Sequence, residues 1–379
     1  MKIYLDNSAT TQVDKEVVKA MMPYFSEKFG NPNSLHEFGR DAREAVENAR
    51  KKIAEMINCE PEEIIFTSGG TESNNLAIKG LIGEKKHIIT SKIEHPSVLE
   101  TCRELEKQGY KVDYISVDKE GIINIQELKR KISNNTLLVS IMHVNNEIGT
   151  IQPLEEIGKI CREFGVLFHT DAVQSFGKIK IDVKNINIDL LSASGHKINA
   201  PKGVGFLYVK KEIKIKPLVN GGGHEKNLRS GTENVPGIVG FGKACEIADK
   251  KMKEKEKIKK LRDKLIQELE KIPGTRLNGS RNLRIFNNVN VSFSGIEGEA
   301  LVLMLDKEGI ATSTGSACSS HSLEPSHVLK AIGLSDLEAH GSLRLSLGWE
   351  NNEKEINFVI DKIRECVDKL RKISKNIEV

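Results

Sequence analysis

The chain has few of the features that mark extracellular, zinc-binding or membrane proteins. Its six cysteines are scattered, with no Cys-x-x-Cys pair and no cluster with histidine. This pattern argues against a disulfide framework and a structural zinc site, and it fits a reducing compartment. No run approaches the roughly 18 apolar residues of a membrane span, and the start, MKIYLDNSATT, lacks the apolar stretch of a signal peptide. We therefore expect a cytoplasmic protein without a membrane partner.

An excess of charge of one sign is also absent. The 379 residues include 57 basic and 53 acidic side chains, for a formal net charge of +4. Such a balance gives no reason to expect a nucleic-acid partner. The Lys-rich run at 249–271 could bind a polyanion, but its interspersed acidic residues favour a long solvated helix.

Short apolar runs alternate with amphipathic stretches between about residues 60 and 215, and this pattern indicates the fold class. The runs predict strands at 64–68, 87–91, 112–117, 136–144, 166–171, 190–194 and 205–209. The stretches between them predict helices at 71–81, 96–108, 125–132 and 153–163. Strands rich in Val, Ile and Leu, separated by helices, indicate a mostly parallel sheet covered on both faces. We predict an α/β protein with a seven-stranded, mostly parallel sheet.

A second, smaller domain is expected towards the C-terminus. The pattern turns helical from residue 235 to about 272, and this helix would join the two domains. Beyond it, strands at 288–293, 310–312 and 343–347 mix with helices at 297–307 and 354–374, as in an α+β domain. We predict a large domain at 15–260 and a small domain formed by 1–14 and 261–379.

Lys197 is the first candidate for chemistry. It ends the run Ser-Gly-His-Lys at 194–197, directly after an apolar strand, and Pro-Lys-Gly-Val-Gly follows at 201–205. A lysine at a strand end is usually exposed and inert. Small and polar neighbours, however, predict a tight turn that directs the amine into a cleft. An amine whose pKa is lowered can bond to an aldehyde cofactor.

Asp171 is the second candidate, because it ends the buried run at 166–171. Ligands of α/β sheets bind at the carboxyl ends of strands. A carboxylate there suits the ring nitrogen of pyridoxal 5'-phosphate (PLP), which it keeps protonated. The alternative is that Asp171 caps the next helix. Gln174, three residues on, could reach the ring hydroxyl of the cofactor.

A glycine pair at 69–70 lies between a predicted strand and a predicted helix, within Phe-Thr-Ser-Gly-Gly-Thr-Glu-Ser-Asn at 66–74. Free backbone N–H groups and the helix dipole make such a position suitable for a phosphate. The signal is weak by itself, because glycine pairs between strands and helices are common.

Cys318 differs from the other cysteines in its surroundings. It lies in Ser-Thr-Gly-Ser-Ala-Cys-Ser-Ser at 313–320, a run of small residues with nothing to pack around a thiol. We expect a loop thiol that can ionise, attack a sulfur atom and pass it on. The remaining cysteines at 59, 102, 161, 245 and 366 are expected to be buried and structural.

Nine longer motifs resemble one enzyme family. They are YLDNSATT at 4–11, FGNPNSLH at 29–36, FTSGGTESNN at 66–75, EHPSVL at 94–99, MHVNNEIGT at 142–150, HTDAVQS at 169–175, SGHK at 194–197, GGGHEKNLRSGTENVPGIVG at 221–240 and STGSACSSHSLEPSHVL at 313–329. With these motifs the whole chain resembles the class V aminotransferase-like enzymes of PLP fold type I. Within that family it is similar to the cysteine desulfurases of the NifS/IscS group.

The resemblance assigns expected roles to individual residues. Lys197 would be the Schiff-base lysine, Asp171 the partner of the pyridine nitrogen and Gln174 that of the ring oxygen. His95 would stack on the ring and assist proton transfer. The phosphate would be held by Gly70, Thr71, Ser194 and His196, and by Thr232 of the other subunit of a homodimer. Asn145 and Arg344 would lie on the substrate side, with Arg344 gripping the carboxylate in a two-pronged contact. Without the resemblance, Arg344 would be taken for a surface salt bridge.

The implied reaction converts L-cysteine to L-alanine and leaves the sulfur on Cys318 as a persulfide. An iron–sulfur scaffold protein or another acceptor would then receive the sulfur. The free enzyme would hold no metal, and Cys318 is a candidate shared cluster ligand in a scaffold complex. The other histidines are expected to be structural or loop residues, with His224 and His321 as the best exceptions. Three alternatives remain open: an aminotransferase, a selenocysteine lyase and a non-catalytic assembly platform of the same fold.

Overall fold

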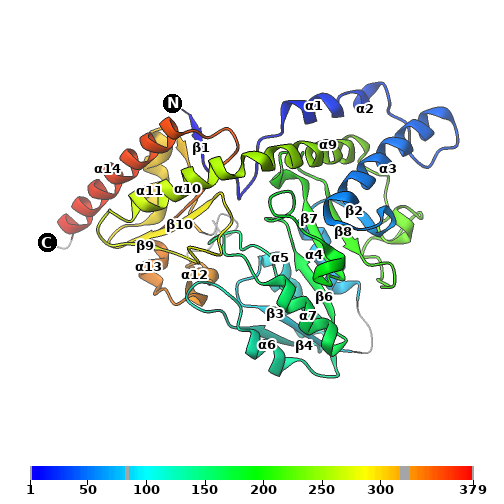
Figure 1. The fold of residues 1–379 in the computed structure, drawn as a ribbon, viewed down its shortest axis with the longest axis horizontal. Helices are drawn as coiled ribbons and strands as arrows, with labels where there is room; N and C mark the ends of the chain where they lie inside the picture. Colours follow the sequence, from blue (N-terminus) through cyan, green and yellow to red (C-terminus); the bar gives the residue numbers. More distant parts are fainter. Residues whose placement is uncertain (1, 82–84, 316–323, 378–379) are drawn as a thin grey trace.

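The computed structural model describes residues 2–81, 85–315 and 324–377. A central seven-stranded sheet has the order β2-β8-β7-β6-β5-β3-β4 (Figure 1). Its strands are β2 (Ile64–Thr67), β3 (His87–Ser91), β4 (Lys111–Ile115), β5 (Thr136–Ser140), β6 (Leu167–Asp171), β7 (Leu190–Ser194) and β8 (Gly205–Val209). Only β8, among these seven, runs against its neighbours β2 and β7. The predicted mostly parallel α/β sheet is confirmed, although the run at 136–144 leaves the strand after Ser140.

Alternating side chains of the strands pack on two different layers of helices. Ile64, Ile89, Val139, Leu191 and Phe206 belong to one buried cluster, which contains residues of α3 (Glu37–Ile57), α6 (Ile125–Lys131), α7 (Leu154–Phe164) and α9 (Val235–Lys251). A directly adjacent residue on each of these strands belongs to another cluster with α4 (Gly70–Lys79) and α5 (Pro96–Lys107), namely Ile65, Ile88, Leu138, Leu190 and Leu207. Because successive side chains of a strand point to opposite faces, both faces of the sheet are covered.

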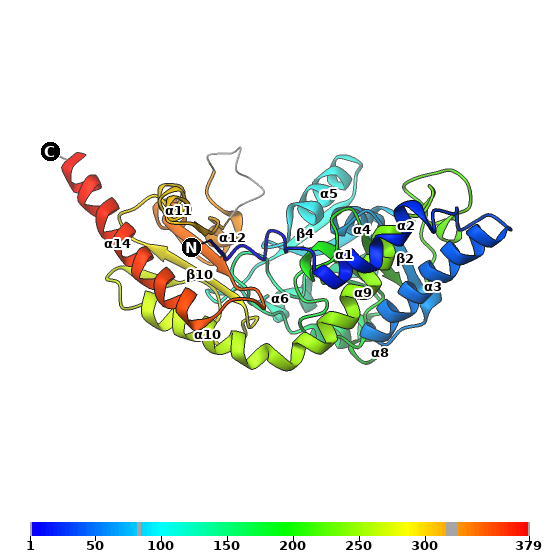
Figure 2. The same ribbon diagram turned by 90° about the horizontal axis from the view of Figure 1, so that it is seen from above.

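A long helical connection joins the two parts of the molecule (Figure 2). It consists of α9, a 3-10 turn at Met252–Glu254 and α10 (Lys255–Leu269). In α10, Ile258, Leu265 and Leu269 are buried, whereas most of the lysines are exposed. The charged run is therefore an amphipathic helix with one buried stripe, in agreement with the predicted solvated helix.

The second part contains a small antiparallel sheet in the order β12-β10-β9. Its strands are β9 (Thr275–Leu277), β10 (Asn288–Phe293) and β12 (Ser342–Ser346), and the helices are α11 (Gly298–Lys307), α12 (His327–Ala331), α13 (Asp336–His340) and α14 (Glu353–Ile377). A short parallel pair joins β1 (Ile3–Tyr4) to β11 (Ile310–Ala311). Ile3 and Leu5 thereby enter the same buried cluster as residues of α10 and α14.

The chain then crosses from this second core to the large sheet through residues 6–12. Asp6 pairs with Ser346, while Thr11 donates its backbone N–H to His196 O at 3.0 Å. Three short helices, α1 (Lys15–Met21), α2 (Pro23–Ser26) and α8 (Val183–Ile186), complete the α-helices and strands of the described residues. Among the described helices, none combines the length and apolarity that crossing a membrane requires.

Candidate active site

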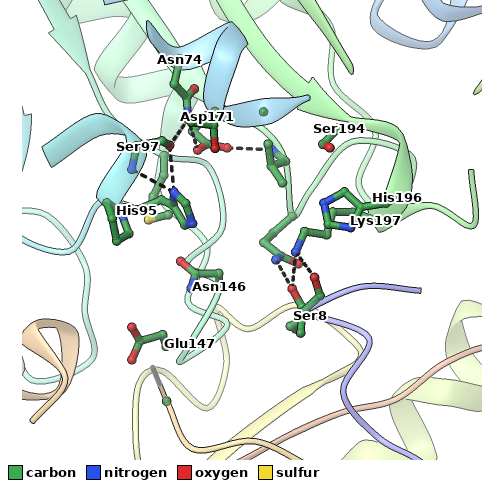
Figure 3. A pocket seen from close by; sticks show the side chains of 18 of the residues that line it. Ser8, Asn74, His95, Ser97, Asn146, Glu147, Asp171, Ser194, His196 and Lys197 are labelled. Carbon is green, nitrogen blue, oxygen red and sulfur yellow. Dashed lines mark hydrogen bonds between the residues drawn. The ribbon is translucent and has the colours of Figure 1, made fainter. Parts of the chain in front are cut away.

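A cavity of about 380 Å³ lies where several strands of the large sheet end. Residues from both parts of the molecule line it (Figure 3). They are Ser8, Ala9, Gly70, Thr71, Asn74, His95, Pro96, Ser97, Met142, Asn146, Glu147, Asp171, Val173, Gln174, Ser194, His196, Lys197, Gly315, His327 and Arg344. The cavity thus brings together most of the residues for which the sequence predicted a role.

Lys197 reaches the cavity from the 3-10 turn Gly195–Lys197, which follows β7 directly. Its Nζ donates hydrogen bonds to Ser8 O at 2.6 Å and Ala9 O at 2.7 Å (Figure 3). The amine therefore points to the segment that crosses between the two cores, and Lys197 is half-buried. The predicted tight turn after a buried strand is present.

Asp171 ends β6 and is buried. One carboxylate oxygen accepts from Asn74 Nδ2 at 2.7 Å and the other from the backbone N–H of Val173 at 2.9 Å. Both carboxylate oxygens are therefore held in place by hydrogen bonds. Asp171 is not the cap of an α-helix, because residues 173–178 form turns.

A hydrogen-bonded chain connects Asp171 to His95 (Figure 3). Asn74 Nδ2 also donates to Ser97 Oγ at 2.9 Å, and Ser97 Oγ lies 2.8 Å from His95 Nδ1. The sequence analysis did not predict Asn74 or Ser97 as site residues. Asn74 lies in the Gly-Gly-Thr-Glu-Ser-Asn motif on the first turns of α4, and that motif is the signal that could have identified it.

The protonation of His95 follows from its contacts. The backbone N–H of Ser97 donates to His95 Nδ1 at 3.1 Å, so Nδ1 is an acceptor and Nε2 carries the proton of the neutral ring. Burial lowers the pKa of His95, and nearby Lys197 and His327 lower it further, whereas Asp171 raises it. The imidazole is consequently neutral at physiological pH.

The glycine pair begins α4, with Gly69 at its N-cap position and φ of +153°. A Cβ on Gly70 would lie 2.6 Å from Val173 Cγ2, so only glycine lets this turn approach the loop that carries Asp171. Thr71, Ser194 and His196 line the same region. Burial lowers the pKa of His196 to about 4, and it is held through Nδ1, 3.0 Å from Thr10 Oγ1.

Gln174 and Arg344 are oriented by the crossing segment. Gln174 Nε2 donates to Ser8 O at 2.9 Å. Arg344 Nη2 pairs with Asp6 at 2.9 Å, and Nη1 donates to Asn146 O at 3.2 Å. Arg344 is only 2% exposed, so it is not the surface salt bridge considered from the sequence. Within the described part of the chain, its Nε has no hydrogen-bond partner.

The structure places Asn145 differently from the substrate-side position predicted for it. Its side chain is absorbed by its own turn: Oδ1 accepts from the backbone N–H groups of Glu147 and Ile148, both at 2.9 Å, and Nδ2 donates to Ile93 O at 2.8 Å. Asn145 does not line the cavity, whereas its neighbour Asn146 does. Asn146 is therefore the better candidate for a substrate contact. The doubled asparagine in Val-Asn-Asn-Glu made the two positions hard to distinguish from sequence.

Two further lining residues were not predicted as functional, His327 and Glu147. His327 had been interpreted as a structural or loop residue, but its Nε2 donates to Glu94 O at 3.0 Å beside His95. Burial raises the pKa of Glu147 to about 7, while Ser326 and Arg344 act to lower it. Thr232 is exposed and does not line the cavity. Cys318 and His321 lie outside the described residues.

The five cysteines that the structure describes are free and buried, as predicted. Burial raises the pKa of Cys102 and of Cys161 to about 12, and it also raises the pKa values of Cys59, Cys245 and Cys366. None of these five is suited to act as a thiolate nucleophile. In the ranges 2–81, 85–315 and 324–377, no group of three His, Cys, Asp or Glu side chains could hold a metal ion.

The donor set of the cavity fits PLP. An amine, a hydrogen-bonded carboxylate, a neutral imidazole and a glycine turn at a helix start face one space, and these are the groups that an aldehyde-bearing, phosphorylated pyridinium ring requires. Arg344 adds a guanidinium to the lining of the same cavity.

Comparisons with known proteins agree with this chemistry. The family model described as aminotransferase class-V matches residues 3–359. The chain is 55% identical to cysteine desulfurase IscS of Methanosarcina thermophila, covering 98% of this chain and 93% of that protein, and 53% identical to cysteine desulfurase IscS of Dictyoglomus turgidum, covering 98% and 96%. A solved NifS-like protein superposes with a TM-score of 0.92 at 41% identity, covering 98% of this chain and 100% of that one. SspA in complex with cysteine has a TM-score of 0.82 at 41% identity, with 91% and 99% covered. The chain belongs to the aminotransferase class-V family and, within it, to the cysteine desulfurases of the NifS/IscS group.

Proposed function

We propose that this cysteine desulfurase uses Lys197, Asp171, His95 and Arg344 to prepare L-cysteine for sulfur transfer to Cys318. The observation that carries the proposal is the single cavity, which is lined by all four of these residues and by Gly315, three residues before Cys318. Gly315 thus connects the cavity wall to the stretch of sequence that contains Cys318.

PLP is the proposed cofactor. When bound, it would supply an electron sink for bond breaking next to the amino group of the substrate. Lys197 would be its point of attachment, and Asp171 would face the ring nitrogen. Gly70, Thr71, Ser194 and His196 would surround the phosphate, and Gln174 would donate to the ring oxygen. The division into domains at 15–260, with 1–14 and 261–379, is proposed alongside, and the two separate buried clusters support it.

The residues of the chain handle substrate and protons. Arg344 binds the carboxylate of L-cysteine through its guanidinium, which Asp6 keeps in place at 2.9 Å. Lys197 Nζ is the base that takes the Cα proton. His95 holds a proton on Nε2 and can pass it to a developing charge.

The sulfur-transfer step balances without an added oxidant. The Cys318 sulfur attacks the substrate sulfur, the Cβ–S bond breaks and an S–S bond forms. The electron pair left on the substrate carbon is protonated, so L-cysteine and a thiol give L-alanine and a persulfide. An iron–sulfur scaffold protein or another acceptor would take the terminal sulfur. A cytoplasmic location is proposed because the described cysteines are free thiols.

A homodimer is also proposed. Thr232 is exposed, as expected for a side chain that serves the phosphate site of the other subunit. Large apolar side chains are exposed between residues 18 and 38, among them Met22, Phe25, Phe29 and Leu35 at 85%. Clusters of exposed apolar side chains mark contact surfaces.

The proposal is tested by incubating the reconstituted protein with L-cysteine. Alanine is measured together with the mass of the Cys318 peptide, which should gain one sulfur atom. Lys197→Ala should lower alanine formation by at least about 100-fold, because a positioned base contributes that much or more. Cys318→Ala should retain the absorbance change on L-cysteine binding but lose persulfide formation. Full alanine output from Lys197→Ala would refute the role of Lys197, and unchanged sulfur output from Cys318→Ala would remove Cys318 as the acceptor.

A further inference from the structure

Glu147 lies in a tightly held turn after β5. Val144 and Ile151 form an antiparallel bridge, and the backbone N–H of Gly149 donates to Asn145 O at 3.0 Å. The Asn145 side chain closes the turn from inside by accepting from the backbone N–H groups of Glu147 and Ile148. The backbone of Glu147 is therefore fixed by its own turn.

The second part of the molecule holds the same turn from the other side. Asn288 Nδ2 and Asn290 Nδ2, both on β10, donate to Glu147 O at 3.1 and 3.2 Å. A Cβ on Gly149 would lie 2.5 Å from Asn288 Oδ1, which shows how closely the turn and β10 approach. Glu147 thus has a rigid base at the junction of the two cores.

The carboxylate of Glu147 contacts both sides of the segment 316–323. Ser326 Oγ donates to Glu147 Oε2 at 2.5 Å (Figure 3 shows the carboxylate at the cavity). A Cβ on Gly315 would lie 2.7 Å from the same oxygen. Glu147 Oε2 therefore lies close both to Gly315, which precedes this segment, and to Ser326, which follows it.

Each side is also anchored to the rest of the site. On the preceding side, the backbone N–H of Arg344 donates to Ser313 O at 2.7 Å, so the backbone at Ser313 pairs with that of Arg344. On the following side, Ser326 caps α12 by accepting from the backbone N–H of Leu329 at 3.2 Å, and His327 lines the cavity. A movement of Glu147 would therefore be transmitted to both sides.

A carboxyl group is a costly choice at this place. Glu147 is 4% exposed, and burying a carboxylate without full pairing is unfavourable. An apolar side chain could fill the space, but it could not accept the hydrogen bond of Ser326. The hydrogen bond is thus the property of Glu147 that packing alone does not explain.

We propose that Glu147 is a positioning residue for sulfur transfer, which holds Gly315 at the cavity wall beside Arg344 and Ser326 next to it. The inference rests on the proposed role of Cys318 as the sulfur acceptor, because Cys318 lies between these two residues in sequence. Glu147 acts on the approach of the thiol, whereas Arg344 acts on the substrate carboxylate. The two functions can be separated by experiment.

The test compares Glu147→Ala, Glu147→Gln and Ser326→Ala in the PLP-loaded enzyme. A single turnover with L-cysteine is quenched at intervals, and the Cys318 peptide is weighed for added sulfur. L-cysteine binding is measured separately from the change in cofactor absorbance. We expect Glu147→Ala and Ser326→Ala to slow persulfide formation by about tenfold or more, since small errors of position are costly, with Kd for L-cysteine within about twofold of the parent. Glu147→Gln can still accept from Ser326 and should regain most of the rate.

Three results would overturn the inference. The first is persulfide formation at the parent rate in Ser326→Ala, which does not depend on whether Glu147→Ala folds. The second is a Kd for L-cysteine that rises as much as the rate falls. The third is a Glu147→Ala/Ser326→Ala double variant whose rate of persulfide formation falls by the product of the two single decreases. Two residues that act through one shared hydrogen bond should not have independent effects. Cys318→Ala is the control for the reaction itself: if it forms alanine and sulfide at the parent rate, the proposed function fails instead.

Discussion

At the scale of single residues, burial decides which ionisable groups can serve the reaction. Glu94, next to His95, is fully buried and accepts from Ser91 Oγ at 2.6 Å and from the backbone N–H of Met142 at 3.0 Å. Burial raises the pKa of Glu94 to about 8, against the lowering effect of these hydrogen bonds. The carboxyl is therefore protonated over much of the range in which an unfolded chain would have lost the proton.

This shift predicts a pH dependence of stability. Between pH about 4.5 and 8 the folded protein holds a proton on Glu94 that the unfolded chain has released, so the free energy of unfolding falls as pH rises. Glu94→Gln removes the titration but keeps the shape, because its amide can donate to Ser91 and accept from Met142. We expect the free energy of unfolding of Glu94→Gln to fall less over this pH range than that of the parent protein, by as much as a few kcal/mol. Urea unfolding midpoints measured at several pH values check this, and parallel profiles for the two proteins would contradict it.

At the scale of elements, strand ends and helix starts place the catalytic groups. Asp171 ends β6, the Ser194–Lys197 run follows β7, and Gly70 begins α4 after β2. Strand β8 lies between β2 and β7, so it fixes the distance from the glycine turn to Lys197. Gly205 opens β8, and a Cβ there would lie 2.6 Å from both Gly69 Cα and Ala193 O.

Gly205→Ala should therefore disturb both the fold and the cofactor site. The new methyl group meets backbone atoms of β7 and of the glycine turn that follows β2, and neither can move aside easily. We expect a loss of about 1–3 kcal/mol in stability, as for other overpacked positions, together with weaker PLP binding. Gly222→Ala is the matched control, because its Cβ would meet only the ring of His224, with Cε1 the nearest atom at 3.6 Å. Equal melting temperatures and PLP affinities for the two variants would show that the close approach of β8 and Gly69 has no energetic role.

At the scale of the whole molecule, the proposed dimer determines whether one chain forms a complete site. Thr232 lies outside the cavity of its own chain, and exposed apolar side chains gather near α1, α2 and the start of α3, where the Phe29 and Phe38 rings lie 5.5 Å apart. A dimer would account for both features, because the second copy would cover the apolar surface and bring its own Thr232 to the phosphate.

Mixed dimers provide a direct measurement. Thr232→Val and Lys197→Ala subunits should each form dimers with low activity, the first because the phosphate is held less well and the second because the base is gone. A heterodimer of the two contains one site with both wild-type residues, so unfolding and refolding a mixture should restore activity. Sedimentation should show dimers throughout. Activity no greater than the average of the two parent dimers would mean that Thr232 serves its own subunit or none.

The sequence by itself determined a large part of this protein. Apolar runs flanked by turn residues are local patterns, and they predicted each strand of the large sheet and the α/β class. Motifs such as SGHK and HTDAVQS identified the family, because the functional residues at a strand end are contiguous in sequence. The buried state of five cysteines followed from the usual burial of free cysteine, and the run of small residues around Cys318 set that residue apart.

Only the tertiary structure decided how distant segments meet. The contact of residues 6–11 with Lys197, Gln174 and Arg344 joins positions more than 160 residues apart, and no local pattern encodes such a contact. The choice between Asn145 and Asn146 depended on which of the two side chains is hydrogen-bonded to nearby backbone groups, and in the structure it is that of Asn145. The chain from Asp171 through Asn74 and Ser97 to His95, and the convergence of Gly315 and Ser326 on Glu147, arise because hydrogen bonds form by proximity in space, which the order of residues along the chain does not specify.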